Sequence, residues 1–255
     1  MKINECDFES AGVSGQRSEI MLRRVKVLIV VPENNTTMEP EISALCPALA
    51  PIQVARVKRP PRTLLLEDLP AYTEATLDAI APFAAEPLDL VIYGCTAAGF
   101  LGGPTSNAQM VERLRERTGA TVVSTAGAMI EALRSAGVAE TAVVTPYLQP
   151  VNDGLRDYLE LSGIKVETLS SFFCKTTAEL GAITEDQVLE LARRTVTPRS
   201  KSLFVACSQL PTLNAVAQLR AEFGIPVWSS IQATVWAGAA ALTHQGLSVP
   251  FNQAA

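Results

Sequence analysis

Two cysteines stand at equivalent places in the two halves of this 255-residue chain, and both have neighbours that suit a reactive thiol. Cys95 lies in Tyr93-Gly-Cys-Thr-Ala-Ala-Gly99, and Cys207 lies in Val205-Ala-Cys-Ser-Gln-Leu-Pro211. In each case a short apolar run ends just before the cysteine, and a hydroxyl residue follows it. Small neighbours let a ligand approach the backbone N–H groups, and such groups stabilise a thiolate. We therefore predict that Cys95 and Cys207 are both catalytic.

Two further polar residues follow strand-like runs and suit substrate binding. Asn35, in Val31-Pro-Glu-Asn-Asn-Thr-Thr-Met-Glu39, fits the cap of a following helix. The same amide, together with uncapped backbone N–H groups, would also hold a carboxylate, and the two roles are compatible. Tyr147 follows Pro146 and is either a core aromatic or a phenol that donates a hydrogen bond to the substrate. We predict a substrate-binding role for both residues.

The other reactive side chains lack such a frame. Cys6, Cys46 and Cys174 are interpreted as structural or incidental thiols, because no two cysteines have the spacing of a metal or redox motif. His244 is the single histidine and is expected in the last turn of a C-terminal helix, so a zinc site built on several histidines is excluded. The sequence also lacks a phosphate-binding loop. We therefore expect neither a metal nor a cofactor.

One basic cluster interrupts an otherwise mildly acidic sequence. Arg56-Val-Lys-Arg-Pro-Pro-Arg62 is interpreted as a solvated edge strand and loop, with a rim that attracts anions as the alternative.

Apolar or β-branched runs alternate with amphipathic stretches along the chain, a pattern typical of an α/β fold with parallel sheets. The predicted strands cover residues 25–31, 90–93, 120–123, 141–145, 165–169, 203–206 and 225–227. The predicted helices cover residues 73–83, 107–118, 127–136, 152–162, 185–195 and 213–223. In such sheets ligands bind at the carboxyl ends of the strands, where both cysteines fall.

The pattern repeats. A strand leads into Pro32 and another into Pro146, each followed at a similar distance by one of the two cysteines. We predict two doubly wound parallel-sheet halves related by pseudo-two-fold symmetry, with the active site between them. The first half comprises residues 23–123 plus 226–255, and the second comprises residues 124–225. Residues 1–22 are predicted to form a disordered N-terminal extension, and Met21 is a plausible natural start.

The composition limits the class of function. The chain is 48% apolar and 18% charged, which predicts a globular protein with a sizeable core. A net charge of −5 argues against binding to nucleic acid, whose phosphates require a basic face. No apolar run approaches the length of a membrane span, and the first residues lack the apolar core of a signal peptide. We expect a cytoplasmic protein with no membrane or nucleic-acid partner.

The sequence also resembles a known family. The motif over residues 31–39 resembles the opening motif of the maleate cis–trans isomerases. The segments 124–133, Val143-Val-Thr-Pro-Tyr147 and 206–216 continue the likeness, which covers nearly all of residues 24–238. The wider group is the aspartate/glutamate racemase superfamily, which also contains hydantoin racemases and arylmalonate decarboxylases.

The resemblance implies a cofactor-independent enzyme with two flavodoxin-like halves that each contribute one thiol. In the isomerases, the thiolate that matches Cys95 adds to the double bond of maleate. Rotation about the resulting single bond, and elimination assisted by the thiol that matches Cys207, give fumarate. Asn35 and Tyr147 match residues that hold substrate carboxylates. The backbone amides of Thr96 and Ser208 would complete the anion cradle.

Two departures from the isomerase pattern concern specificity. The loop from Cys95 to Phe100 resembles those of racemases and decarboxylases, and Thr177 stands roughly where the isomerases carry an asparagine that binds a carboxylate. We therefore expect the substrate to be maleate or a similar small unsaturated dicarboxylate, with Thr177 near its second carboxylate. The resemblance also implies a homodimer or higher homo-oligomer.

Other activities remain open at this point. The main alternative is a two-thiol racemase or epimerase of an amino acid, a hydantoin or a related carbon acid. A decarboxylase-like or ectoine-utilisation enzyme is also compatible, although arylmalonate decarboxylases have glycine where Cys95 stands. A non-catalytic binding protein that kept the fold is disfavoured by the presence of both thiols.

Overall fold

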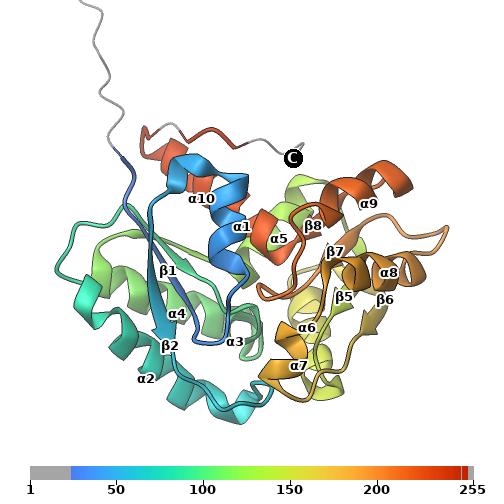
Figure 1. The fold of residues 1–255 in the computed structure, drawn as a ribbon, viewed down its shortest axis with the longest axis horizontal. Helices are drawn as coiled ribbons and strands as arrows, with labels where there is room; N and C mark the ends of the chain where they lie inside the picture. Colours follow the sequence, from blue (N-terminus) through green and yellow to red (C-terminus); the bar gives the residue numbers. More distant parts are fainter. Residues whose placement is uncertain (1–23, 248, 252–255) are drawn as a thin grey trace, which may run out of the picture.

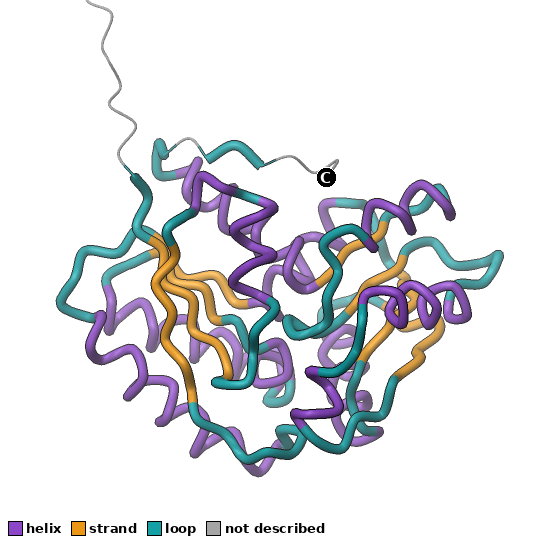
Figure 2. Tube along the Cα trace, viewed as in Figure 1, coloured by secondary structure: helices purple, strands orange, loops and turns teal. Residues whose placement is uncertain are grey.

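The computed structural model describes residues 24–247 and 249–251, and within them the chain forms two parallel sheets flanked by helices (Figures 1 and 2). The predicted disordered extension over residues 1–22, which includes Cys6, lies outside the described residues. No described helix has both the length and the apolar content that a membrane span requires.

The two sheets have the same topology. The first sheet has the order β2-β1-β3-β4, and the second has the order β6-β5-β7-β8. The first contains β1 (Val27–Pro32), β2 (Ile52–Val57), β3 (Leu90–Tyr93) and β4 (Thr121–Ser124). The second contains β5 (Glu140–Thr145), β6 (Lys165–Ser171), β7 (Leu203–Val205) and β8 (Val227–Ser229). The α/β fold with two doubly wound sheets is therefore confirmed.

The residue before each predicted catalytic cysteine makes the same backbone hydrogen bond to the neighbouring central strand in both halves. Gly94 donates its N–H to the carbonyl of Val30 at 2.8 Å, and Ala206 donates to the carbonyl of Val144 at the same distance. Each of these residues directly precedes a predicted catalytic cysteine. The repeat in the sequence thus places both thiols one residue beyond the same ladder hydrogen bond.

Helices cover the sheets and connect their strands. They are α1 (Met38–Leu45), α2 (Leu69–Ile80), α3 (Thr96–Phe100), α4 (Gly103–Thr118), α5 (Thr125–Ser135), α6 (Gln149–Leu161), α7 (Thr177–Gly181), α8 (Glu185–Thr195), α9 (Ala215–Phe223) and α10 (Ser230–His244). The helices that follow β4 and β8, α5 and α10, pack against each other between the sheets (Figure 1). Their first turns are capped by the hydroxyls of Ser124 and Ser229, which accept from Gly127 N at 3.0 Å and Gln232 N at 3.2 Å.

The central strands form the core because their side chains are apolar on both faces. All residues of β1 and β3 are buried, as expected for strands covered by helices on either side. One strand, β2, was missing from the predicted set. It is an edge strand in which three of six residues are half-buried and one is exposed, so its sequence lacks the continuous apolar run of its neighbours. Its carboxyl end overlaps the basic cluster, which confirms an edge strand there.

Candidate active site

A buried cavity lies where the carboxyl ends of the two sheets meet, with a volume of about 30 Å³. Its walls come from the segments that follow β1, β2 and β3 in the first half, and β5, β6 and β7 in the second. Every predicted site residue lines it: Asn35, Cys95, Thr96, Tyr147, Thr177, Cys207 and Ser208. The structure therefore brings these residues together, and their individual roles remain predictions.

The two thiols are almost completely buried, with 3% of Cys95 and 6% of Cys207 exposed. Burial raises the pKa of Cys207, and the nearby Cys95 acts in the same direction. The backbone N–H of Gln209, 3.4 Å from the Cys207 sulfur, and the hydroxyl of Tyr147 lower this pKa again. The net rise favours a protonated Cys207 at neutral pH.

Gly94 allows the Cys95 loop to lie close to the first strand and helix. A Cβ at this position would be only 2.7 Å from the Val31 side chain and 2.7 Å from the sulfur of Met38. Glycine therefore removes the side chain that would push Cys95 away from the sheet.

Tyr147 presents its hydroxyl to the cavity beside Cys207. Its ring packs edge-on against Phe100, with the ring centroids 5.6 Å apart. The hydroxyl is buried and has no hydrogen bond of normal geometry within the protein, although it influences the Cys207 pKa. Burial holds the pKa of Tyr147 well above its usual range. The residue is thus a protonated donor beside Cys207, and its role in substrate binding stays a prediction.

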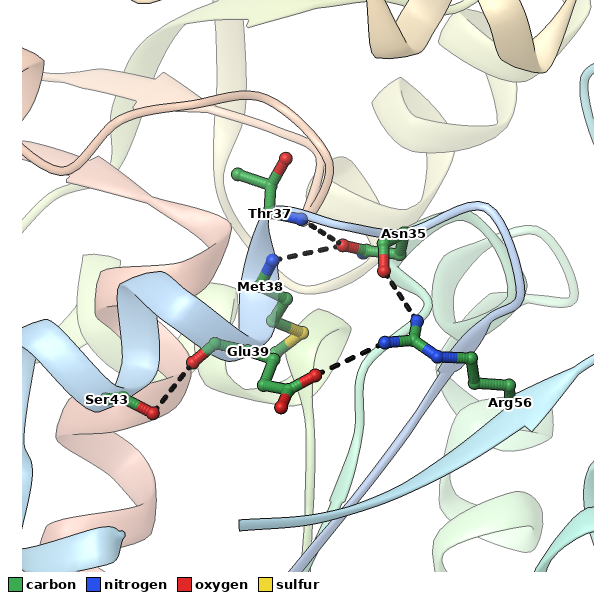
Figure 3. A network of polar contacts seen from close by, with 6 residues as sticks. All are labelled: Asn35, Thr37, Met38, Glu39, Ser43 and Arg56. Carbon is green, nitrogen blue, oxygen red and sulfur yellow. Dashed lines mark hydrogen bonds and ion pairs between the residues drawn. The ribbon is translucent and has the colours of Figure 1, made fainter. Parts of the chain in front are cut away.

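Asn35 has a structural role that the sequence predicted, and a contact that it did not. Its Oδ1 accepts hydrogen bonds from the backbone N–H groups of Thr37 and Met38, both at 3.0 Å, so it caps the start of α1 (Figure 3). Its Nδ2 is 3.1 Å from both the carbonyl and the hydroxyl oxygen of Ser208. The N–H groups proposed for a carboxylate are therefore already capped, and Asn35 joins α1 to the Cys207 loop.

Arg56 holds the segment that contains Asn35 in place through the Asn35 backbone. Its Nη1 donates to the carbonyl of Asn35 at 2.8 Å, and its Nη2 pairs with Glu39 at 3.2 Å (Figure 3). Part of the basic cluster thus positions the residue that caps α1.

The two cysteine loops are hydrogen-bonded to each other across the halves. The backbone N–H of Ser208 donates to the Thr96 hydroxyl at 3.2 Å, and the Ser208 hydroxyl donates to the carbonyl of Gly94 at 2.6 Å. The Ser208 amide predicted for the anion cradle therefore has a protein partner. These bonds fix the position of Cys207 relative to Cys95.

Two loops, residues 59–64 after β2 and residues 172–177 after β6, meet over the cavity; we call them the crossing loops. Arg62 and Thr176 form an isolated antiparallel bridge. Thr177 donates its backbone N–H to the carbonyl of Pro61 at 3.2 Å, and its hydroxyl is 3.5 Å from the same oxygen. Thr177 therefore lines the cavity but directs its polar atoms at the opposite loop.

Several cavity residues were missed by the sequence analysis. Arg59, assigned there to a solvated loop, lines the cavity, and so does Cys174, assigned there as structural or incidental. Burial raises the pKa of Cys174 to about 11, which favours the protonated thiol. Asn34 and Gln209 also line the cavity, and each has a buried side-chain oxygen without a protein partner. Their position in the sequence could have identified them, since each of these residues follows the end of a strand by a few residues.

Tyr72 is a further residue without a sequence signal. It lies in α2, and its buried hydroxyl has no partner of normal hydrogen-bond geometry, yet its pKa is raised by burial and by the neighbouring Cys95. Each predicted catalytic thiol therefore has a buried phenol beside it.

The remaining cysteine and the histidine lie elsewhere. The Cys46 thiol is 3.5 Å from the carbonyl of Pro250, and His244 is exposed in the last turn of α10, as predicted. In the described part of the chain, no group of three or more histidine, cysteine or acidic side chains could hold a metal ion.

The sequence is similar to those of known proteins. A model of the arylmalonate decarboxylase family (Amdase) matches residues 70–251. The maleate isomerase of Nocardia farcinica is 30% identical over 216 residues, which make up 82% of this chain and 86% of that protein.

Solved structures of two maleate isomerases share the fold. A Nocardia farcinica enzyme with a cysteine replaced by serine, which holds a covalently bound succinylcysteine intermediate, has a TM-score of 0.79 and 27% identity over 86% of this chain and 93% of that chain. The maleate isomerase Iso of Pseudomonas putida S16, solved with maleate as a cysteine-to-alanine variant, has a TM-score of 0.79 and 27% identity over 88% of this chain and 92% of that chain.

These matches define the class: a two-half α/β enzyme whose neighbours use a cysteine in catalysis. The chain belongs to the arylmalonate decarboxylase (Amdase) family. Its maleate isomerase relatives identify it as an isomerase.

Proposed function

We propose that this protein isomerises maleate, or a similar small cis-unsaturated dicarboxylate, to the trans isomer. The observation that carries the proposal is the pair of buried thiols, one from each half, in a single cavity. The covalent succinylcysteine of the Nocardia farcinica relative supports thiolate addition as the first step.

In the proposed reaction, the thiolate of Cys95 forms a C–S bond to one alkene carbon, and the displaced electron pair moves to the other. Cys207 protonates that second carbon, which leaves a single bond free to rotate. Cys207 then takes a proton back, the trans double bond forms, and the C–S bond breaks, so atoms and charge balance.

The surroundings of the thiols support this division of roles. The raised pKa of Cys207 keeps a proton on the residue that must donate one. The Tyr147 hydroxyl lies beside Cys207 and has no hydrogen bond of normal geometry in the protein, so it can donate to a substrate carboxylate and stabilise the negative charge that develops on it.

A proton NMR time course with maleate under reducing conditions tests the proposal. We expect the wild-type protein to form fumarate, and we expect Cys95→Ser and Cys207→Ser each to lose at least roughly a thousandfold in rate, because a serine hydroxyl replaces neither thiol. Cys46→Ala is the matched control, since Cys46 is buried outside the cavity.

Absence of fumarate with the folded wild-type protein would contradict the proposal. The same two thiols would also suit removal of a proton from one face of a carbon and its return to the other. Deuterium uptake at Cα of a chiral amino acid or hydantoin in heavy water, without alkene isomerisation, would identify the racemase or epimerase instead.

A further inference from the structure

Among the described residues that line the cavity, Arg59 is the one arginine, lysine, histidine, aspartate or glutamate. It follows the end of β2 and belongs to one of the crossing loops. The other lining residues include no acidic side chain and no further basic one, so Arg59 supplies the positive charge that the cavity offers to a ligand.

The guanidinium of Arg59 is held in place but not neutralised. Its Nη2 donates to the carbonyl of Arg62 at 2.7 Å, which anchors the side chain. Its Nε is buried and has no hydrogen-bond partner in the protein. The nearby carboxylate of Asp68 is bound instead by Arg62, at 2.7 and 2.8 Å. A buried, unpaired donor on a cation is costly unless a ligand satisfies it.

The Arg59 charge reaches the reacting groups. It lowers the pKa of both Cys207 and Tyr147, although burial outweighs it at each of these groups. The positive charge therefore acts inside the cavity and is not fully screened by solvent.

We propose that Arg59 binds one carboxylate of the substrate and makes the site selective for dianions over monoanions. The planar guanidinium presents its donors in a fork that matches a carboxylate. Thr177, the other candidate near this position, directs its N–H and hydroxyl at Pro61. The inference rests on the proposed function, because it assigns a partner to the second carboxylate of the same substrate.

Binding of a saturated ligand tests this assignment without any turnover. Succinate is a dicarboxylate that cannot isomerise, and succinamate replaces one of its carboxylates by a neutral amide. Isothermal titration calorimetry would compare both ligands on the wild-type protein, Arg59→Gln, Arg59→Lys and the control Lys58→Gln. Lys58 is exposed, lies next to Arg59 and is absent from the cavity wall, so its variant makes the same charge change outside the site.

We expect the wild-type protein and Lys58→Gln to bind succinate more tightly than succinamate. Arg59→Gln should lose roughly 10- to 100-fold in succinate affinity and most of the preference for the dianion, as expected for a lost charge-assisted hydrogen bond. Arg59→Lys should retain part of the succinate affinity and part of the preference for the dianion. The KM for maleate should rise more than kcat falls.

The proposal is overturned if Arg59→Gln keeps the wild-type ratio of the two affinities, or if Lys58→Gln loses the same amount. It is also overturned if the wild-type protein binds succinate no better than succinamate, a result that needs no variant to fold. If succinate binding depends on Arg59 but maleate is not converted, the proposed reaction fails and the charge selectivity stands. If maleate is converted but succinate binding does not depend on Arg59, the proposed reaction stands and the role of Arg59 in it is wrong.

Discussion

Cys95 and Cys207 are both buried, yet their sulfur atoms have different neighbours. Cys207 accepts a hydrogen bond from the Gln209 N–H and lies beside the Tyr147 hydroxyl. Cys95 lies beside the hydroxyl of Tyr72, which projects from α2. Two thiols with unequal surroundings suit a reaction in which one attacks as thiolate and the other carries a proton.

Replacing Tyr147 by phenylalanine should lower kcat/KM by roughly 10- to 100-fold, because a donor to a developing charge is lost. It should also move the alkaline limb of the pH profile upward. The hydroxyl lowers the pKa of Cys207, so its removal makes the proton on that thiol harder to lose.

The matched control is Tyr158→Phe. Tyr158 is a buried tyrosine that also contacts Phe100 but does not line the cavity. A Tyr147→Phe profile that overlays the wild-type profile would show that the hydroxyl acts on neither the substrate nor Cys207.

The sequence alone predicted those site residues that lie in a repeated segment or a recognisable motif. Cys95 and Cys207 could be found because the chain presents the same frame twice. Arg59 and Cys174 could not, because their importance depends on two loops from different halves meeting over one cavity. A single basic cluster is usually solvated, and nothing in its own sequence indicates a partner more than a hundred residues away.

Among the elements, α1 connects the first half to the loop that carries Cys207. Glu41 on this helix is buried and accepts from the backbone N–H of Thr212 at 2.8 Å and from its hydroxyl at 3.1 Å. Burial raises the pKa of Glu41 to about 7, with the charge of Glu185 adding to the effect, although both Thr212 bonds oppose it.

This pKa makes folding stability depend on pH. The folded protein holds the Glu41 proton more tightly than the unfolded chain does. Protonated Glu41 therefore adds to the free energy of unfolding near pH 4.5, and this stabilisation is lost as the pH rises through about 7. Relative to Glu41→Gln, the free energy of unfolding of the wild-type protein should fall by up to about 3 kcal/mol across this window. Urea unfolding at a series of pH values measures the difference.

Glu39→Gln provides the comparison, because Glu39 lies on the same helix but is paired with Arg56 at the surface. Its stability difference from the wild-type protein should vary much less over this range. Parallel curves for the wild-type protein and Glu41→Gln would contradict the burial effect.

The elements themselves were largely predictable, and the misses have physical causes. The central strands are continuous apolar runs, so their positions follow from the sequence. The helices α2, α4 and α6 begin three or four residues earlier than predicted, each with a proline in the first turn. Proline is favoured in the first turn because it lacks the N–H that this turn leaves unpaired. These helices therefore begin beside a proline, before the first residues of the amphipathic pattern from which they were predicted.

For the whole molecule, the consequence of the pseudo-symmetry is a site that neither half can form alone. The crossing loops close it, because Arg62 pairs with Thr176 and the Thr63 hydroxyl donates to the carbonyl of Cys174 at 2.9 Å. A cavity of about 30 Å³ has room for little more than an ordered water. A four-carbon dicarboxylate is larger, so we expect the crossing loops to separate before the substrate enters.

A reversible cross-link between the crossing loops tests this expectation. The double variant Arg62→Cys/Thr176→Cys places two cysteines at an antiparallel bridge, where the Cα separation suits a disulfide. Oxidation should lower the rate with maleate by roughly tenfold or more, because opening is blocked, and reduction should restore it.

The two single-cysteine variants serve as controls for oxidation of the cavity thiols. If the cross-linked protein retained full activity, substrate entry would not require separation of the crossing loops.

In the proposed reaction, Cys95 forms the bond to the substrate and Cys207 moves the proton. Intact-protein and peptide mass spectrometry of Cys207→Ser after brief exposure to maleate tests it most directly. We expect a mass increase equal to one maleic acid, located on Cys95, and no such adduct in Cys95→Ser. An adduct on Cys207 in Cys95→Ser, or no adduct on Cys95 in a Cys207→Ser protein that still binds succinate, would contradict it.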